Sequence, residues 1–122
     1  MEVVLLNAVS LNMLPPSSDV GQLTYSKITL RQAADICLEH VLTVNAIGHA
    51  DTDYIVRTAL ASEGCLAPEG KRMDVTLSSG KIYLVAQYRG PRLPEGAKEL
   101  PKGTKLEWYR VRFESFFDTY PN

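Results

Sequence analysis

The chain has 122 residues, of which 45% are hydrophobic and 22% charged, and its formal net charge is -1 at pH 7. This composition predicts one compact domain over residues 1–117 and a short frayed tail over 118–122. Near-neutral charge argues against a general surface for long nucleic acid, so a phosphate ligand would be small and held locally. No run of about 18 apolar residues could cross a bilayer and no cationic segment opens the chain, so we expect a cytoplasmic protein without membrane contact.

The first elements are predicted to alternate between strand and helix. A continuous apolar run at residues 3–6 is typical of a strand buried on both faces. Residues 23–28 indicate a second strand. Thr29 and Gln32 then resemble a capping box, in which the threonine caps a helix and the glutamine reaches back to it. A first helix should follow directly.

A corner follows the next apolar run, which stops at Gly48. Helical spacing of the later apolar residues predicts a second helix over residues 52–62, with Asp51 or Thr52 as its cap. Gly48 would act as a hinge that delivers His49 to the start of this helix. Free backbone N–H groups and the helix dipole attract anions there, so His49 could meet a phosphate ester.

The second half of the chain predicts more strands and one long loop. Residues 73–77 and 82–87 flank a Ser-Ser-Gly turn, which favours an antiparallel hairpin. Residues 88–104 are rich in proline and glycine and predict an irregular loop, which could serve as a lid over a pocket. Residues 106–113 indicate a final strand, with Trp108 on the face opposite Tyr109. These elements predict an α/β domain with about five to six strands and two helices.

The two cysteines, Cys37 and Cys65, lack a second cysteine or a histidine at metal-binding spacing. We therefore interpret both as reduced thiols and expect neither a metal site nor a cofactor. Acidic residues also do not cluster with histidines, which argues against a metal-dependent phosphodiesterase.

Four sequence blocks, in order, resemble the signature blocks of the viral type III anti-CRISPR ring nucleases. They are residues 7–14, residues 45–49, Arg72 with the strand that it opens, and Gln87 followed by residues 92–96. The similarity spans residues 2 to about 114. The chain departs from the archaeal viral members by an insertion at residues 88–91, which lengthens the loop and adds Arg89 as a competitor of Arg92.

The resemblance implies an enzyme that destroys cyclic tetra-adenylate, the second messenger of type III CRISPR defence. It also implies a small α/β homodimer, with a mixed sheet flanked by α-helices, that binds the ring at the subunit interface and needs no metal. In the implied reaction a ribose 2′-OH attacks the neighbouring phosphorus, a 2′,3′-cyclic phosphate forms, and the 5′-oxygen leaves. Two such cuts would give linear di-adenylates and switch the signal off.

The residues present suit this chemistry. Histidine side chains titrate near neutral pH, so His49 can protonate the 5′-oxygen as a general acid. Arg92 could hold phosphate oxygens while charge builds up, and Glu95 could orient His49 or Arg92, or accept the 2′-OH proton. Under the resemblance, the substrate-binding residues are Asn7, Ser10, Asn12, Asn45, Gly48, Arg72, Val75, Gln87 and Arg89.

Several alternatives stay open at this point. Asn45 could face the pocket or brace the corner by hydrogen bonds, and the asparagines and serine after the first strand could simply form a turn. Arg92 could be an ordinary solvated arginine. At the level of function, the rivals are a non-catalytic protein that sequesters the messenger and a structural or regulatory viral protein that binds no nucleotide.

Overall fold

The computed structural model describes residues 1–40 and 42–116; the predicted tail at 118–122 and the predicted domain end at 117 lie outside them. The elements in chain order are β1 (Glu2–Leu6), the short 3-10 helix η1 (Leu11–Met13), β2 (Val20–Ile28), α1 (Leu30–Glu39), β3 (Leu42–Asn45), α2 (Ala50–Ser62), β4 (Ile82–Arg89) and β5 (Lys105–Phe116). None of the described helices has the length and apolar character needed to cross a membrane.

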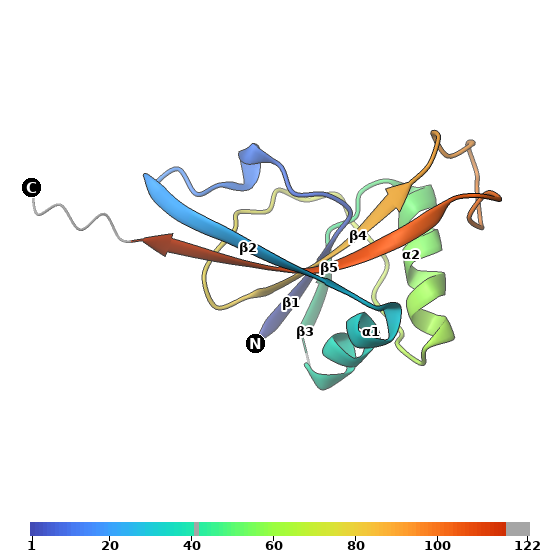
Figure 1. Cartoon of the computed structure of the whole chain (residues 1–122), viewed down its shortest axis with the longest axis horizontal. Helices are drawn as coiled ribbons and strands as arrows, with labels where there is room; N and C mark the ends of the chain where they lie inside the picture. Colours follow the sequence, from blue (N-terminus) through green and yellow to red (C-terminus); the bar gives the residue numbers. More distant parts are fainter. Residues whose placement is uncertain (41, 117–122) are drawn as a thin grey trace, which may run out of the picture.

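The strands form one mixed sheet in the order β2-β5-β4-β1-β3. β1 runs parallel to both of its neighbours, β3 and β4. β5 runs antiparallel to β4 and to the edge strand β2, and Figure 1 shows β2 and β5 as a long pair of strands that extends beyond the rest of the sheet. The predicted α/β fold with a mixed sheet in a single small domain is thereby confirmed, with five strands.

Both helices pack on one face of the sheet. The capping box at the start of α1 is confirmed, since the Gln32 backbone N–H donates to Thr29 Oγ1 over 3.1 Å and the Thr29 N–H donates to Gln32 Oε1 over 2.8 Å. The buried side of α1 and the buried side of α2 join alternate residues of the central strands in the larger core cluster. Trp108 belongs to this face, and Tyr109 to the other, as predicted.

Irregular segments cover the other face of the sheet, and here the predicted hairpin is wrong. Residues 73–77 form no strand, although the turn at residues 78–80 does form, with Gly80 at φ +87°. The reason is that both edges of β4 are already occupied, one by β1 and the other by β5. Leu77 is instead buried in the smaller core cluster, and its N–H donates to the carbonyl of Met13 over 2.7 Å.

Both cysteines lie buried as free thiols in the larger core cluster. Burial, followed by the neighbouring Cys65, raises the pKa of the Cys37 thiol to about 12. Burial also raises the pKa of Cys65. The two thiols are therefore protonated and unreactive at neutral pH.

Candidate functional site

Three of the four sequence blocks follow the carboxyl ends of three adjacent parallel strands. β4, β1 and β3 are neighbours that run in the same direction, so their last residues meet at one end of the sheet. Residues 7–12 follow β1, residues 46–49 follow β3, and residues 90–95 follow β4. Ligands of open α/β sheets bind outside the carboxyl ends of the strands, where connections diverge to opposite sides. The fold therefore brings the predicted site segments to the end of the sheet at which a ligand site is expected.

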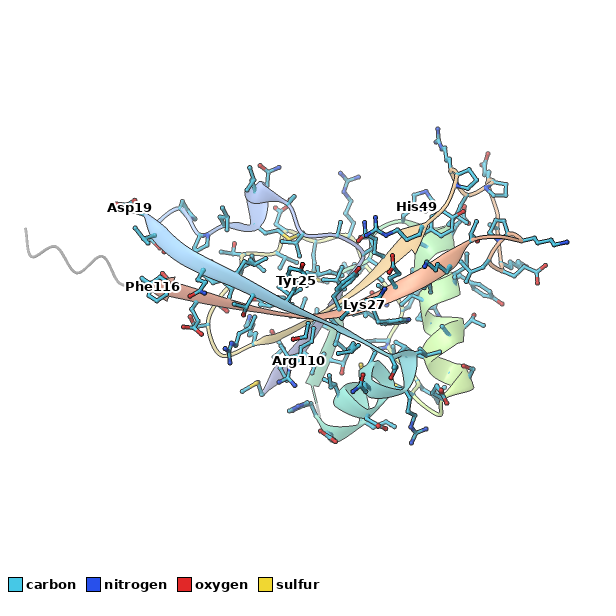
Figure 2. All side chains as sticks on the ribbon, in the orientation of Figure 1. Asp19, Tyr25, Lys27, His49, Arg110 and Phe116 are labelled. Carbon is cyan, nitrogen blue, oxygen red and sulfur yellow. The ribbon has the colours of Figure 1, made fainter. Side chains whose placement is uncertain are left out.

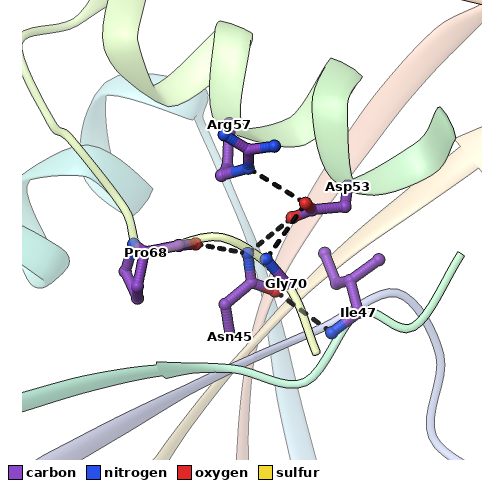
Figure 3. Close-up of polar contacts among 6 residues, drawn as sticks. All are labelled: Asn45, Ile47, Asp53, Arg57, Pro68 and Gly70. Atoms are coloured by element: carbon purple, nitrogen blue, oxygen red, sulfur yellow. Dashed lines mark hydrogen bonds and ion pairs between the residues drawn. The ribbon is translucent and has the colours of Figure 1, made fainter. Parts of the chain in front are cut away.

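A buried polar network fixes the corner between β3 and α2 (Figure 3). Asn45 is only 3% exposed; its amide donates to Asp53 Oδ1 over 2.6 Å and to the Pro68 carbonyl over 2.8 Å. Its side-chain oxygen accepts the N–H of Ile47 over 3.1 Å. These bonds occupy both of its donors, so the structure gives Asn45 the bracing role among the two alternatives and not a place in the pocket.

The carboxylate of Asp53 is the centre of this network. Its other oxygen, Oδ2, accepts the Gly70 N–H and the Arg57 Nε–H, each over 3.0 Å. An ionised carboxylate that is 3% exposed requires such a complete set of partners. Asp53 thus joins β3, α2 and the irregular segment after α2 in one place.

Gly48 and Gly70 are required by close packing. A Cβ at Gly48 would lie 2.9 Å from Cβ of Arg72, and a Cβ at Gly70 would lie 2.4 Å from the carbonyl oxygen of Ile47. Gly48 does not have a positive φ. Glycine is needed there because it leaves space for the Arg72 side chain, and not as the predicted hinge. Its contact places Arg72, whose side chain is exposed, beside the His49 corner.

His49 is the N-cap residue of α2, which begins at Ala50, two residues earlier than predicted. The expected caps are wrong: Asp51 and Thr52 lie inside the first turn, because the chain turns into the helix directly after Gly48. Among the described residues, no side chain caps this turn. The backbone donors at this end of α2 are thus available to an anion, and the exposed imidazole stands beside them.

The loop between β4 and β5, residues 90–104, is called the lid loop here. It has no regular structure, as predicted, but begins two residues later than expected because β4 continues to Arg89. A turn closed by the Ala97 N–H and the Pro94 carbonyl over 3.1 Å has Gly96 at φ +78°. The Gly96 N–H donates to Asp51 Oδ2 over 3.0 Å, which ties the lid loop to the first turn of α2.

Next to this bond, an open cavity of about 730 Å³ lies between the lid loop and the start of α2. Figure 2 shows His49 at this corner of the molecule. The residues that line the cavity include His49, Asp51, Arg92, Leu93, Pro94 and Glu95. All three predicted catalytic residues therefore line the same cavity. An imidazole, a guanidinium and a carboxylate are the groups that acid-base chemistry on a phosphodiester requires.

Arg89 lies outside this cavity, in an ion network on the sheet. Its Nε donates to Glu107 Oε1 over 2.6 Å, and Lys27 Nζ lies 2.5 Å from Glu107 Oε2. Lys27 and Arg89 lower the pKa of Glu107 to about 2. The Tyr109 hydroxyl and the Glu107 carboxylate raise the pKa of Arg89. This carboxylate holds Arg89 on the sheet, whereas Arg92 faces the His49 cavity.

The remaining predicted binding residues do not line the His49 cavity. Asn7 and Asn12 are exposed, and Ser10 lines a separate cavity of about 710 Å³ beside η1. Gln87 and Arg89 line a further cavity of about 390 Å³. Val75 packs against the smaller core cluster. A single copy of the chain thus brings together the predicted catalytic residues but not all of the predicted binding residues.

The sequence analysis missed two features of the site. Asp53 and Gly70 complete the corner, and Asp51 anchors the lid loop. Acidic residues are common in the first turn of a helix, so Asp53 alone gives no sign of a buried role. Its only signal in the sequence is that it follows Asn45 by eight residues. Within the part of the chain that the structure describes, no group of three or more His, Cys, Asp or Glu residues could hold a metal ion.

The fold and the site define a small α/β protein with its candidate anion site at the carboxyl ends of parallel strands. The STIV B116-like family model matches residues 3–107, and the chain belongs to this family. Among solved structures it is similar to B116 of Sulfolobus turreted icosahedral virus, with 27% sequence identity and a TM-score of 0.70. That match covers 92% of this chain and 99% of B116. No curated protein matches the chain. The recognition made from the sequence blocks is thus confirmed at the level of the family.

Proposed function

We propose that this protein is a metal-independent ring nuclease that cleaves cyclic tetra-adenylate into linear di-adenylates and thereby switches off type III CRISPR signalling. The observation that carries the proposal is the shared cavity of His49, Arg92 and Glu95 at the uncapped start of α2. Family membership supports a viral protein class, and the resemblance of the sequence blocks supports the substrate.

In the proposed step, a ribose 2′-oxygen attacks the adjacent phosphorus while the bond from phosphorus to the 5′-oxygen breaks. The proton of the 2′-OH passes to Glu95 or to water, and His49 gives its proton to the departing 5′-oxygen. The helix N–H groups and Arg92 stabilise the charge on the phosphoryl oxygens. The products are a 2′,3′-cyclic phosphate and a free 5′-OH, so the step consumes no water.

We further propose that the protein acts as a homodimer with the ring at the subunit interface. Each copy has one His49 cavity, and a ring of four equivalent nucleotides can present two opposite phosphates to two copies related by a twofold axis. The scattered binding residues of a single copy agree with this arrangement. Molar mass from light scattering, with and without cyclic tetra-adenylate, tests it.

The decisive experiment incubates cyclic tetra-adenylate with the protein in excess EDTA and analyses the products by mass spectrometry. We expect linear di-adenylates with cyclic phosphate ends. His49→Ala should lower the cleavage rate by about 10²–10⁴-fold, the usual contribution of a general acid, and should still bind the ring. Intact ring bound tightly by the parent protein would identify a sequestering protein, and a folded parent that neither binds nor cleaves it would refute the proposal.

A further inference from the structure

Tyr25 is a large aromatic side chain that the fold leaves exposed on the sheet. It lies on the edge strand β2, opposite Val111 of β5, and is 71% exposed. Its ring meets the ring of Tyr109 edge to face, with centroids 5.9 Å apart and an interplanar angle of 71°. Tyr109 therefore supports the Tyr25 ring from one side, and the remaining surface of that ring is open to a ligand.

The Tyr25 ring lines the cavity of about 390 Å³ that also contains Gln87 and Arg89. Its apolar wall comes from Leu23, Val9 and the two tyrosines, and its polar groups are the Gln87 amide and the Arg89 guanidinium. A volume of this size lies at the small end of ligand pockets, which combine apolar walls with a few placed polar groups. An aromatic ring, an amide and a guanidinium are the groups that stack on and hydrogen-bond to nucleobases.

The polar side of this cavity is held in place before any ligand arrives. Lys27 and Arg89 approach Glu107 from the strands on either side, and the side chain of Glu107 is only 11% exposed. The contact to Arg89 uses Nε, so it fixes the plane of the guanidinium. A guanidinium that is already held in one orientation loses less conformational entropy when a flat ligand binds to it.

The position of the cavity relates it to the proposed catalytic site. Val9 follows the carboxyl end of β1, and Arg89 is the last residue of β4, three residues before Arg92. The cavity therefore lies on the sheet face opposite the two helices and extends to the end of β4, from which the lid loop leaves. A nucleotide whose phosphate occupies the His49 cavity can direct its base toward this hollow.

We propose that this hollow is a purine-base subsite, in which an adenine stacks on Tyr25 and its edge is hydrogen-bonded by Gln87. An amide side chain can pair with the N6 and N7 positions of adenine in a bidentate manner. This inference rests on the proposed function, because the base is that of a nucleotide in the cleaved ring. It adds Tyr25 and Tyr109 to the ligand-binding residues, neither of which belongs to the four sequence blocks.

The test measures binding of cyclic tetra-adenylate by calorimetry in the His49→Ala background, where cleavage is suppressed. Loss of one stacking platform should raise Kd roughly tenfold to a hundredfold in Tyr25→Ala. Tyr25→Phe keeps the ring and should bind within about threefold of the parent. Leu38→Ala, which truncates an exposed apolar side chain on α1, serves as the matched control and should bind like the parent.

Light scattering on each variant separates stacking from a contact between copies. A molar mass of Tyr25→Ala equal to that of the parent, together with weaker binding, supports the subsite. A Tyr25→Ala protein with a lower molar mass would assign the ring to an interface, and one with unchanged Kd would show that no base stacks there; either result overturns the inference.

A second experiment tests the base subsite independently of the ring nuclease activity. Adenosine 5′-monophosphate is titrated into the labelled parent protein, and the amide signals of Tyr25 and Gln87 are followed by NMR. Shifts at both residues in a protein that does not cleave the ring would retain the subsite and remove the proposed function. Cleavage with no shift at either residue, and no binding defect in Tyr25→Ala, would retain the function and remove the subsite.

Discussion

Two arginines near the end of β4 have different surroundings, and this difference distinguishes their proposed roles. Arg92 lines the His49 cavity, whereas Arg89 is bound to Glu107 on the sheet. The sequence alone left both candidates open, since an insertion of four residues separates Gln87 from Arg92. These positions support our proposal that Arg92 stabilises charge and that Arg89 binds the ligand.

We expect Arg92→Ala to lower kcat for cyclic tetra-adenylate by about 10²–10³, the usual cost of removing one transition-state donor. Arg89→Ala should raise Kd and leave kcat within about tenfold, since the residue lies outside the catalytic cavity. Single-turnover kinetics separate the two effects. A larger loss of kcat in Arg89→Ala than in Arg92→Ala would transfer the role to Arg89.

At the level of elements, the corner between β3 and α2 depends on one carboxylate. Asp53 binds Asn45, Arg57 and the backbone of Gly70, and its side chain is only 4% exposed. Removal of this carboxylate leaves a buried amide and a backbone N–H without an acceptor. The irregular segment between α2 and β4 would then lose its attachment to the helix.

Asp53→Ala should therefore lower the free energy of unfolding by about 3 kcal/mol, as expected for one partner removed from a buried ion pair. Asp35→Ala on α1 is the control: it breaks an exposed pair with Arg31 and should cost less than about 1 kcal/mol. Urea unfolding monitored by circular dichroism measures both. Equal losses would show that the network contributes no more than a surface pair.

The lid loop is attached to α2 by the bond from the Gly96 N–H to Asp51, which itself lines the cavity of Arg92 and His49. Asp51→Ala should lower kcat/KM by roughly tenfold to a hundredfold, because a displacement of about 1 Å is enough for such a loss. Asp51→Asn keeps an oxygen acceptor and should restore most of the activity. The melting temperature of Asp51→Asn should match that of the parent.

Glu99→Ala removes an exposed carboxylate from the same loop without touching the bond to Gly96, and it should keep the parental kcat/KM. Activity in Asp51→Ala equal to that in Glu99→Ala would show that the lid loop does not need its anchor.

Sequence periodicity and capping signals predicted most elements because these signals are local. The capping box before α1 and the alternation in β5 each depend on residues that are close in sequence. The hairpin failed because a turn signal does not specify which strands compete for the edges of β4. The start of α2 was misplaced because Asp51 has a partner, Gly96, that lies 45 residues away.

The catalytic residues were predicted from the resemblance of the sequence blocks, and the structure places them in one cavity. The buried network could not be predicted in the same way. Asn45 and Asp53 are separated by two element boundaries. The need for glycine at position 70 is evident only from the structure, where a Cβ would lie within 3 Å of Ile47 and Asp53. The exposure of Tyr25 on β2 could not be predicted either, because alternation along a strand does not show which face of the sheet is left exposed to solvent.

At the scale of the whole sheet, Glu107 of β5 connects Lys27 of β2 with Arg89 of β4. These partners lower the pKa of Glu107 from its ordinary value of 4.5 to about 2. A carboxyl group with a depressed folded-state pKa stabilises the fold fully above its ordinary pKa and loses that contribution as the pH falls toward the folded value. The relevant window is therefore between about pH 5 and pH 2.

We expect the melting temperature of the parent to exceed that of Glu107→Gln by a constant margin above pH 5, and the margin to shrink as the pH falls toward about 2. Differential scanning calorimetry at a series of pH values measures it. Glu99→Gln, whose carboxyl is exposed, serves as the control. A margin that stays constant down to pH 2 would show that the ion network does not stabilise the folded state.

β1 is the only described strand with a parallel neighbour on each side, and the His49 corner, the polar segment after β1 and the lid loop all depend on those two pairings. Parallel neighbours must be recruited from distant parts of the chain, which makes their assembly slow. A partly folded copy would consequently lack the His49 cavity, and with it the proposed ring nuclease activity, until β1 has paired with both β3 and β4.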